Sequence, residues 1–139
     1  MKIVEDTFSG FKEKNNHLFF KGQIYDAYSL MIDIFNKAKE EIIIIDNYVD
    51  KNLLDILLKT NKKVVIITNK YNNEDYNKYK QQYKNTELII NNNFHDRFII
   101  LDNKILYHCG ASFKDLGSKC FEISRIDDKD ILNKILKKV

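Results

Sequence analysis

The stretch "EIIIIDNYVDKNLLDILLKTNKKVVIITN", residues 41–69, decides the fold of this 139-residue chain. Two runs rich in β-branched residues, within 41–50 and 62–69, predict strands that are buried on both faces, because neither run alternates apolar with polar residues. Residues 51–60 between them have the pattern of a short helix. Such a strand–helix–strand unit joins two parallel strands through a right-handed connection. The stretch therefore predicts the core of an α/β sheet.

The rest of the chain supplies further elements of both kinds. Apolar spacing predicts helices at 23–39, at 72–84 with one tyrosine stripe, and at 128–138. Strands are predicted at 86–91, 97–102, 104–109 and 120–126, with a short edge strand within 17–22. We expect an α/β fold, a mixed sheet flanked by helices, formed by residues 1–139 as a single domain.

The composition narrows the class of protein. The hydrophobic content of 44% and the charged content of 31% are ordinary for a globular domain, and the longest apolar run, Ile42–Ile45, is too short to span a bilayer. Two cysteines are too few for a disulfide framework, and no cysteine–histidine spacing resembles a zinc site. The net charge of +3 permits contact with nucleic acid without requiring it. We expect a cytoplasmic protein with no membrane contact, no metal and no cofactor.

A second stretch, "FHDRFIILDNKILYHCGASFKDLG" at 94–117, brings polar side chains to an otherwise apolar strand. His95 and Arg97 are two residues apart at the start of the predicted strand, so we expect their side chains on one face of the sheet. A neutral imidazole can attack phosphorus, and a guanidinium can hold two phosphate oxygens at once. The alternative is a solvated strand entrance, and periodicity does not decide between the two.

Two carboxylates extend this candidate site. Glu122 stands between apolar residues in a predicted strand, where a carboxylate needs a partner, and it could hold one imidazole nitrogen while leaving the other free. Asp102 lies at the far end of the strand that begins at Arg97. It is interpreted either as a substrate-binding residue or as an ordinary hairpin residue before Asn103. His108 is interpreted as a packed or edge histidine rather than a catalytic partner.

Small and polar residues at the ends of neighbouring strands form the remaining candidates. Gly110 begins a turn of small residues in which the backbone could approach a ligand, and Ser112 belongs to the same turn. Asp46 and Tyr48 follow the first buried strand, at the carboxyl end where open α/β sheets bind ligands. Their alternative reading is ordinary loop polarity.

"HDRFIILD" followed by "CGAS" resembles the signature of the phospholipase D superfamily, H-x-K-x-x-x-x-D followed by a G-S-x-N turn and, further on, a carboxylate. The segment 41–69 is also similar to that family, so the resemblance covers about residues 40–125. It implies that His95 is the nucleophile that forms a phosphohistidine. It also implies that Arg97 stands at the phosphate-binding lysine and Glu122 at the carboxylate that orients the histidine.

The sequence departs from the family pattern in two places. Arg97 replaces a lysine, which keeps the charge but changes its shape and hydration. Gly110 follows Asp102 after seven residues, one more than in the family. Matching the turn on Gly110 puts Phe113 at the family's asparagine, whereas matching it on Ser112 puts Lys114 there. We prefer the second match, because Ser112 and Lys114 can contact phosphate oxygens.

The chain has one such motif, whereas the family builds an active site from two, so the resemblance implies a homodimer. It is similar to the short bacterial nucleases of the family and to part of some phage-associated DNA-binding regulators. Two functions therefore stand as hypotheses. One is a metal-independent phosphodiesterase acting on nucleic acid. The other is a catalytically inactive module that binds a phosphate, nucleic acid or protein partner in a phage or host regulatory setting.

Overall fold

The structure is a computed structural model that describes residues 16–139. Residues 1–15, which the single predicted domain includes, lie outside the described part. The elements follow in the order β1 (Asn16–Phe19), α1 (Ile24–Asn36), β2 (Glu41–Ile45), β3 (Tyr48–Val49), α2 (Lys51–Leu57), β4 (Lys63–Thr68), β5 (Lys70–Tyr71), α3 (Asn73–Gln82), β6 (Thr86–Ile90), β7 (Arg97–Leu101), β8 (Ile105–Cys109), η1 (Phe113–Asp115), β9 (Phe121–Ile126) and α4 (Lys129–Lys138).

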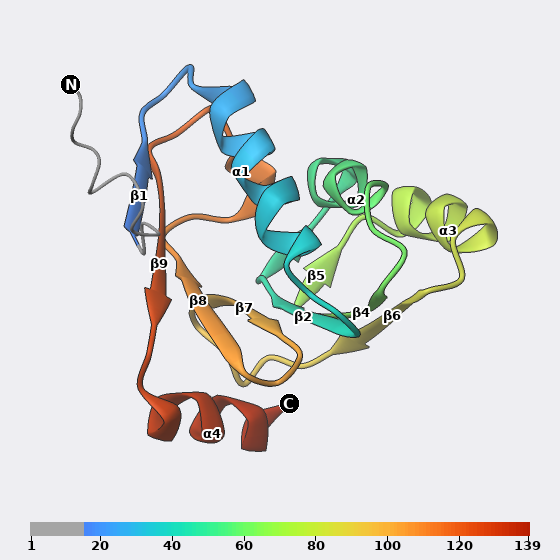
Figure 1. Cartoon of the computed structure of the whole chain (residues 1–139). Helices are drawn as coiled ribbons and strands as arrows, with labels where there is room; N and C mark the ends of the chain where they lie inside the picture. Colours follow the sequence, from blue (N-terminus) through green and yellow to red (C-terminus); the bar gives the residue numbers. More distant parts are fainter. Residues whose placement is uncertain (1–15) are drawn as a thin grey trace.

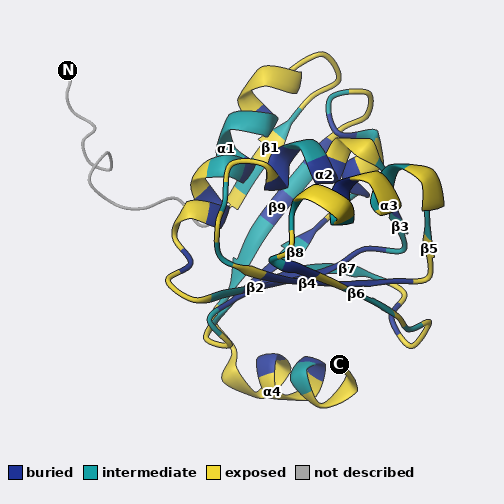
Figure 2. Ribbon diagram, turned by 90° about the vertical axis from the view of Figure 1, so that its right-hand side faces the viewer, coloured by how far each residue is buried: buried dark blue, intermediate teal, exposed yellow. Residues whose placement is uncertain are grey.

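Seven strands form one mixed sheet in the order β1-β9-β8-β7-β2-β4-β6 (Figure 1). β2, β4 and β6 are parallel, whereas β7, β8, β9 and β1 continue the sheet in antiparallel pairs. Helices α1, α2 and α3 cover one face, and α4 lies against the other (Figure 2). The predicted α/β class and mixed sheet are confirmed. No helix of residues 16–139 has the length and apolarity needed to cross a bilayer.

The four isoleucines of β2 explain how the core is divided. Ile42 and Ile44 pack with the residues of α1, α2 and α3, whereas Ile43 and Ile45 pack with Leu132 and other residues of the α4 side. All four isoleucines are buried, because successive side chains of a strand point to opposite faces and here both faces are covered. The run of apolar residues in the sequence is continuous because both faces of this strand are buried.

Helix α1 ends at Asn36, three residues before the predicted end, and the segment that follows it is held by Asp102, the residue after β7. The carboxylate of Asp102 accepts hydrogen bonds from the backbone N–H groups of Lys39, Glu40 and Glu41 at 2.9, 2.8 and 3.0 Å. These contacts turn the chain out of the helix and into β2. The hydrogen-bonded residues are 61 to 63 positions apart in the sequence, so local periodicity does not predict these bonds.

The directions of the strands fix where polar side chains gather. β2, β4 and β6 end at the same edge of the sheet, and β8 also ends there because β7 runs antiparallel to both β2 and β8. β7 and β9 begin at this edge. We call it the carboxyl edge. Segments far apart in the sequence therefore place their first or last residues beside one another here, as open α/β sheets commonly do at ligand sites.

Candidate phosphate site at the carboxyl edge

Asp46 and Ser112 form a buried pair on the α1–α3 side of this edge. The Ser112 hydroxyl lies 2.8 and 3.0 Å from the two carboxylate oxygens of Asp46, and the Phe113 N–H donates to Asp46 Oδ2 at 2.9 Å. The Tyr48 N–H donates to Asp46 Oδ1 at 3.3 Å. Burial raises the pKa of Asp46, and the hydrogen bond from Phe113 is the largest effect opposing that rise. The structure thus brings together three of the predicted site residues, Asp46, Tyr48 and Ser112.

Arg97 is the first residue of β7 and pairs across the sheet with Cys109 of β8. Its side chain is 26% exposed, and its guanidinium lowers the pKa of Asp46 electrostatically. The Nη1 atom lies 3.5 Å from Asp96 Oδ1, whereas Nε is buried and has no hydrogen-bond partner within residues 16–139. A buried guanidinium N–H without an acceptor is uncommon, so Arg97 has a donor that the described residues do not satisfy.

A second histidine, His108, lies between two carboxylates on the α4 side of the edge. Its Nε2 atom is 2.7 Å from Asp96 Oδ2, and its Nδ1 atom is 4.0 Å from Glu122 Oε1. Glu122 also accepts a hydrogen bond from the Ser124 hydroxyl. The sequence interpretation treats His108 as a packed or edge residue and does not single out Asp96. The only sequence signal for this cluster is the position of Asp96 between His95 and Arg97.

His95 itself lies in the bend before β7 and is exposed. It helps to line an open hollow of about 410 Å³ beside α4, whereas Arg97 follows the α1–α3 side of the sheet through Ile99. His95 lies two residues before β7 begins and is therefore not part of the strand, whereas the expectation that His95 and Arg97 face one phosphate stays a prediction. Within the single described chain Glu122 contacts His108 and not His95, so the predicted pairing of Glu122 with His95 is not formed here.

Asp102 does not lie with the other candidates. It follows the last residue of β7 at the opposite edge, where its carboxylate is engaged by three backbone N–H groups, and the bond from Lys39 is the main cause of its lowered pKa. Its role in the structure is the hairpin and loop role that the sequence left open, because Asp102 and Asn103 have φ values of 55° and 56°. Asp102 is therefore not part of the cluster at the carboxyl edge, and its role in substrate binding stays a prediction.

Gly110 and Lys114 take different positions around the edge. The Gly110 N–H donates to the Glu122 carbonyl at 2.7 Å, and a Cβ on Gly110 would lie 3.2 Å from Glu122 Oε1. Glycine therefore allows the close approach of β8 and β9 beside the His108 cluster. Lys114 Nζ lies 2.9 Å from Asp115 Oδ2, and this bond is the main cause of the lowered pKa of Asp115. The Lys114 ammonium is thus already paired.

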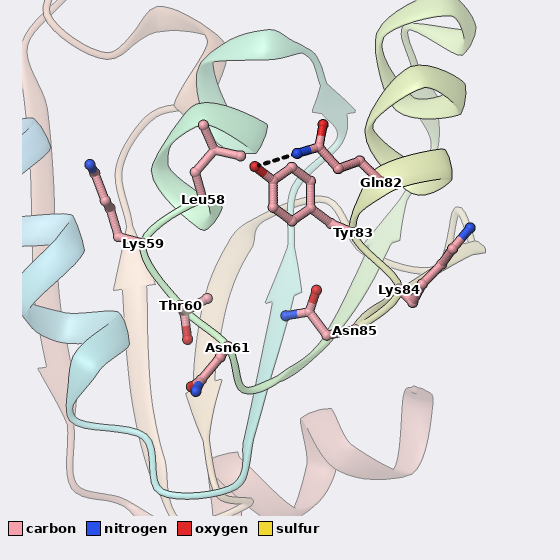
Figure 3. Close-up of a pocket in the computed structure, with 8 residues that line it drawn as sticks. All are labelled: Leu58, Lys59, Thr60, Asn61, Gln82, Tyr83, Lys84 and Asn85. Atoms are coloured by element: carbon pink, nitrogen blue, oxygen red, sulfur yellow. Dashed lines mark hydrogen bonds between the residues drawn. The ribbon is translucent and has the colours of Figure 1, made fainter.

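Residues 16–139 contain no group of three or more His, Cys, Asp or Glu side chains arranged to hold a metal ion. Another hollow, of about 590 Å³, is larger than the one beside His95 (Figure 3). It lies where β4 and β6 begin, at the edge of the sheet opposite to His95. Lys59 and Lys84 extend away from it, and neither a histidine nor a carboxylate lines it. The groups that can act on a phosphate therefore gather at the carboxyl edge and not in the larger hollow.

The order of the strands and helices is shared with solved structures of other proteins. Neither a protein-family model nor a curated protein matches the sequence. Among solved structures, NucT from Helicobacter pylori is similar with a TM-score of 0.62 and 20% identity, over 88% of this chain and 91% of that one. Nuc from Salmonella typhimurium, a phospholipase D family member, is similar with a TM-score of 0.57 and 18% identity, over 88% and 90% of the two chains. The archaeal chromatin protein TrmBL2 is similar with a TM-score of 0.54 and 14% identity, over 92% of this chain and 52% of that one. These likenesses establish the shared fold.

Proposed function

We propose that the protein is a metal-independent phosphodiesterase of the phospholipase D type that cleaves nucleic acid through a phosphohistidine at a dimeric site. The observation that carries the proposal is the position of the H-x-R motif. It opens β7 at the edge where Asp46, Ser112 and Glu122 arrive from three other segments. The shared fold with Nuc, a phospholipase D family member of nearly equal length, supports the same assignment.

The proposed reaction has two displacement steps. A ring nitrogen of His95 attacks the phosphorus, so an N–P bond forms while the P–O bond to the leaving oxygen breaks. The partner's His95 gives its proton to that oxygen and then takes a proton from water. The water oxygen attacks the phosphorus and releases His95. Arg97 stabilises the charge on the phosphoryl oxygens, because a guanidinium can donate to two oxygens of one phosphate.

The test is hydrolysis of single-stranded and double-stranded DNA by the purified chain in excess EDTA. We expect cleavage that persists in EDTA and is abolished by His95→Ala. His17→Ala is the matched control, because it removes a histidine from the edge strand β1, where the His17 ring stacks on Phe19. A folded dimer that cleaves neither substrate at high protein concentration would exclude the enzyme.

One observation favours a second function, a binding module that has lost catalysis. Glu122 is engaged by His108 and Ser124, and the Ser112 hydroxyl is engaged by Asp46, so two groups that the family resemblance assigns to the site already have partners. In that case Arg97 would still bind a phosphate. The two functions separate in one comparison: the binding module binds DNA in an Arg97-dependent way without any cleavage.

A further inference from the structure

Apart from His95 itself, the proposed reaction does not use the residues that line the hollow beside His95. It occupies about 410 Å³ between the bend before β7 and one face of α4. Phe94 and Phe98 contribute from the sheet side, and Ile131, Lys134 and Lys138 contribute from the helix. A volume in this range is typical of sites for small organic ligands, which span roughly 300–1,000 Å³.

The α4 side of the hollow combines apolar and cationic groups. Ile131 is 39% exposed although it is a large hydrophobic residue, whereas Leu132 beside it is buried at 7%. Lys134 and Lys138 follow at three and seven residues from Ile131, so the three side chains share one face of the helix. The Lys138 ammonium lies 5.8 Å from the centroid of the Phe94 ring. The hollow thus has a mainly apolar lining with two lysines on the helix side, and Asn93, His95 and Asp96 add polar groups from the bend before β7.

We propose that this hollow is the subsite for a nucleobase of a single-stranded nucleic acid whose adjoining phosphate reaches His95. The inference rests on the proposed function, since it names the substrate that the same edge would take. Continuity supports it, because His95 is itself part of the lining and any group attached to the reacting phosphorus must lie near it.

The chemistry of the lining fits a base better than a bare phosphate. A nucleobase has two apolar faces that stack against aromatic and aliphatic side chains, and its neighbouring phosphates attract lysines. Lys134 and Lys138 supply that charge beside Phe94 and Ile131. A base in duplex DNA is stacked and paired, so it can enter such a hollow only after it has left the double helix. The site therefore selects single strands over duplex.

The test compares two labelled ten-nucleotide strands of equal charge, oligothymidylate and an abasic strand, by fluorescence anisotropy with the full chain carrying His95→Ala, which by the proposed function cleaves neither strand. This chain is expected to bind oligothymidylate at least about fivefold more tightly, which is the low end of a base-stacking contribution. Ile131→Asp should remove this preference, and Lys134→Glu should weaken binding of both strands. Lys137→Glu is the matched control, because Lys137 is an exposed lysine of α4 that does not line the hollow.

Three outcomes would overturn the inference. Equal affinity for oligothymidylate and the abasic strand would mean that the protein contacts only the phosphate backbone and no base. Equal affinity for the single strand and its duplex would exclude entry of a base. Binding to phosphatidylglycerol vesicles that is lost in Ile131→Asp, without any base preference, would assign the hollow to a lipid surface. Circular dichroism of each variant verifies that the substituted helix is still folded.

A substrate without a base separates this inference from the proposed function. Bis(4-nitrophenyl) phosphate contains a phosphodiester but no nucleobase, so its hydrolysis reports the reaction centre alone. If it is not hydrolysed while the base preference is present, the phosphodiesterase proposal fails and the subsite stands. If it is hydrolysed and no base preference is found, the subsite fails and the enzyme stands.

Discussion

Arg97 lies between two carboxylates that belong to different faces of the sheet. Asp96 contacts its Nη1 atom at 3.5 Å, and the charge of Arg97 lowers the pKa of Asp46, which burial raises. The arginine therefore compensates negative charge at the edge even when no phosphate is bound. Its unpartnered Nε shows that these contacts, within residues 16–139, do not use the full donor capacity of the guanidinium.

We expect Arg97→Ala to lower phosphodiester hydrolysis by about 100-fold, the usual effect of removing one group that stabilises developing charge. Arg97→Lys should lower it by about tenfold, because a point charge loses one charge-assisted hydrogen bond worth about 1.5 kcal/mol. Steady-state rates in EDTA measure both variants. A lysine variant faster than the natural protein would mean that arginine impairs the site.

Asp102 is expected to act on stability and not on binding. Asp102→Asn should lower the free energy of unfolding by about 1 kcal/mol at pH 7, a modest value because the carboxylate is largely screened by solvent. Backbone N–H groups hold the pKa of Asp102 below its ordinary value of 3.8, so its contribution is present above that value and is lost as the pH falls further.

Urea unfolding of the natural chain and Asp102→Asn at pH 7 and pH 3 measures this effect. The difference between the two proteins should shrink at pH 3. The oligonucleotide affinity of the variant should equal that of the natural chain at pH 7. A large loss of affinity in a stable variant would return Asp102 to the binding site.

Single residues are the hardest level to predict from the sequence. Asp46 and Ser112 are recognisable as candidates, yet the bond between them joins residues 66 positions apart, and only the folded sheet reveals it. Glu122 is expected beside His95, but the pairing of β8 with β9 sets His108 opposite Ser124 and brings Glu122 to His108. The register follows an 11-residue connection, 110–120, that has no strand periodicity from which it could be predicted.

At the level of elements, the sequence predicts every α-helix of residues 16–139 and every strand of the seven-stranded sheet to within a few residues, whereas the 3-10 helix η1 is not predicted. Apolar runs suffice for β2 and β4, because two-sided burial leaves a continuous signal. The small sheet of β3 and β5 is not predicted, since two residues in each strand are too few for a pattern. The end of α1 is predicted too late, and the segment after it, residues 39–41, is held by the distant Asp102, which local periodicity cannot show.

Two glycines test how the chain enters α1. Gly22 has a φ of 96° and has open space where a Cβ would lie, whereas Gly117 has a φ of 85° and its Cβ would lie 2.4 Å from Ile24 Cβ. The Gly22 N–H also donates to the Gly117 carbonyl at 3.0 Å. The loop before α1 and the loop before β9 are thus in direct contact.

We expect Gly22→Ala to lower the free energy of unfolding by about 1 kcal/mol, the cost of a left-handed conformation for alanine. Gly117→Ala should cost about 1–3 kcal/mol more, because it also overpacks against Ile24. Urea denaturation of the two variants compares them directly. Equal losses would mean that α1 moves to accommodate the methyl group.

For the whole molecule, the carboxyl edge is half of the proposed reaction centre. One His95 can form the phosphohistidine, but the leaving oxygen needs a proton from a second group. In the proposed dimer that group comes from the partner chain. His108 is bonded to Asp96 at 2.7 Å, so the described chain already uses its second nearby imidazole as part of a carboxylate cluster.

We therefore expect sedimentation to give a mass twice the 16.5 kDa of one chain under conditions of activity. On dilution below the dimer dissociation constant, specific activity should fall in proportion to the dimer fraction. Activity measured across a dilution series, with sedimentation at the same concentrations, tests this relation. Constant specific activity in a fully monomeric sample would contradict the shared reaction centre.

The covalent intermediate tests the central claim most directly. The chain is mixed with excess single-stranded DNA in EDTA, quenched in base within the first turnovers, digested and mapped by mass spectrometry. The account predicts a phosphoryl-linked nucleotide on His95 that appears before product and is absent from His95→Ala. An adduct on another residue, or product formation with no adduct at any time, would contradict it.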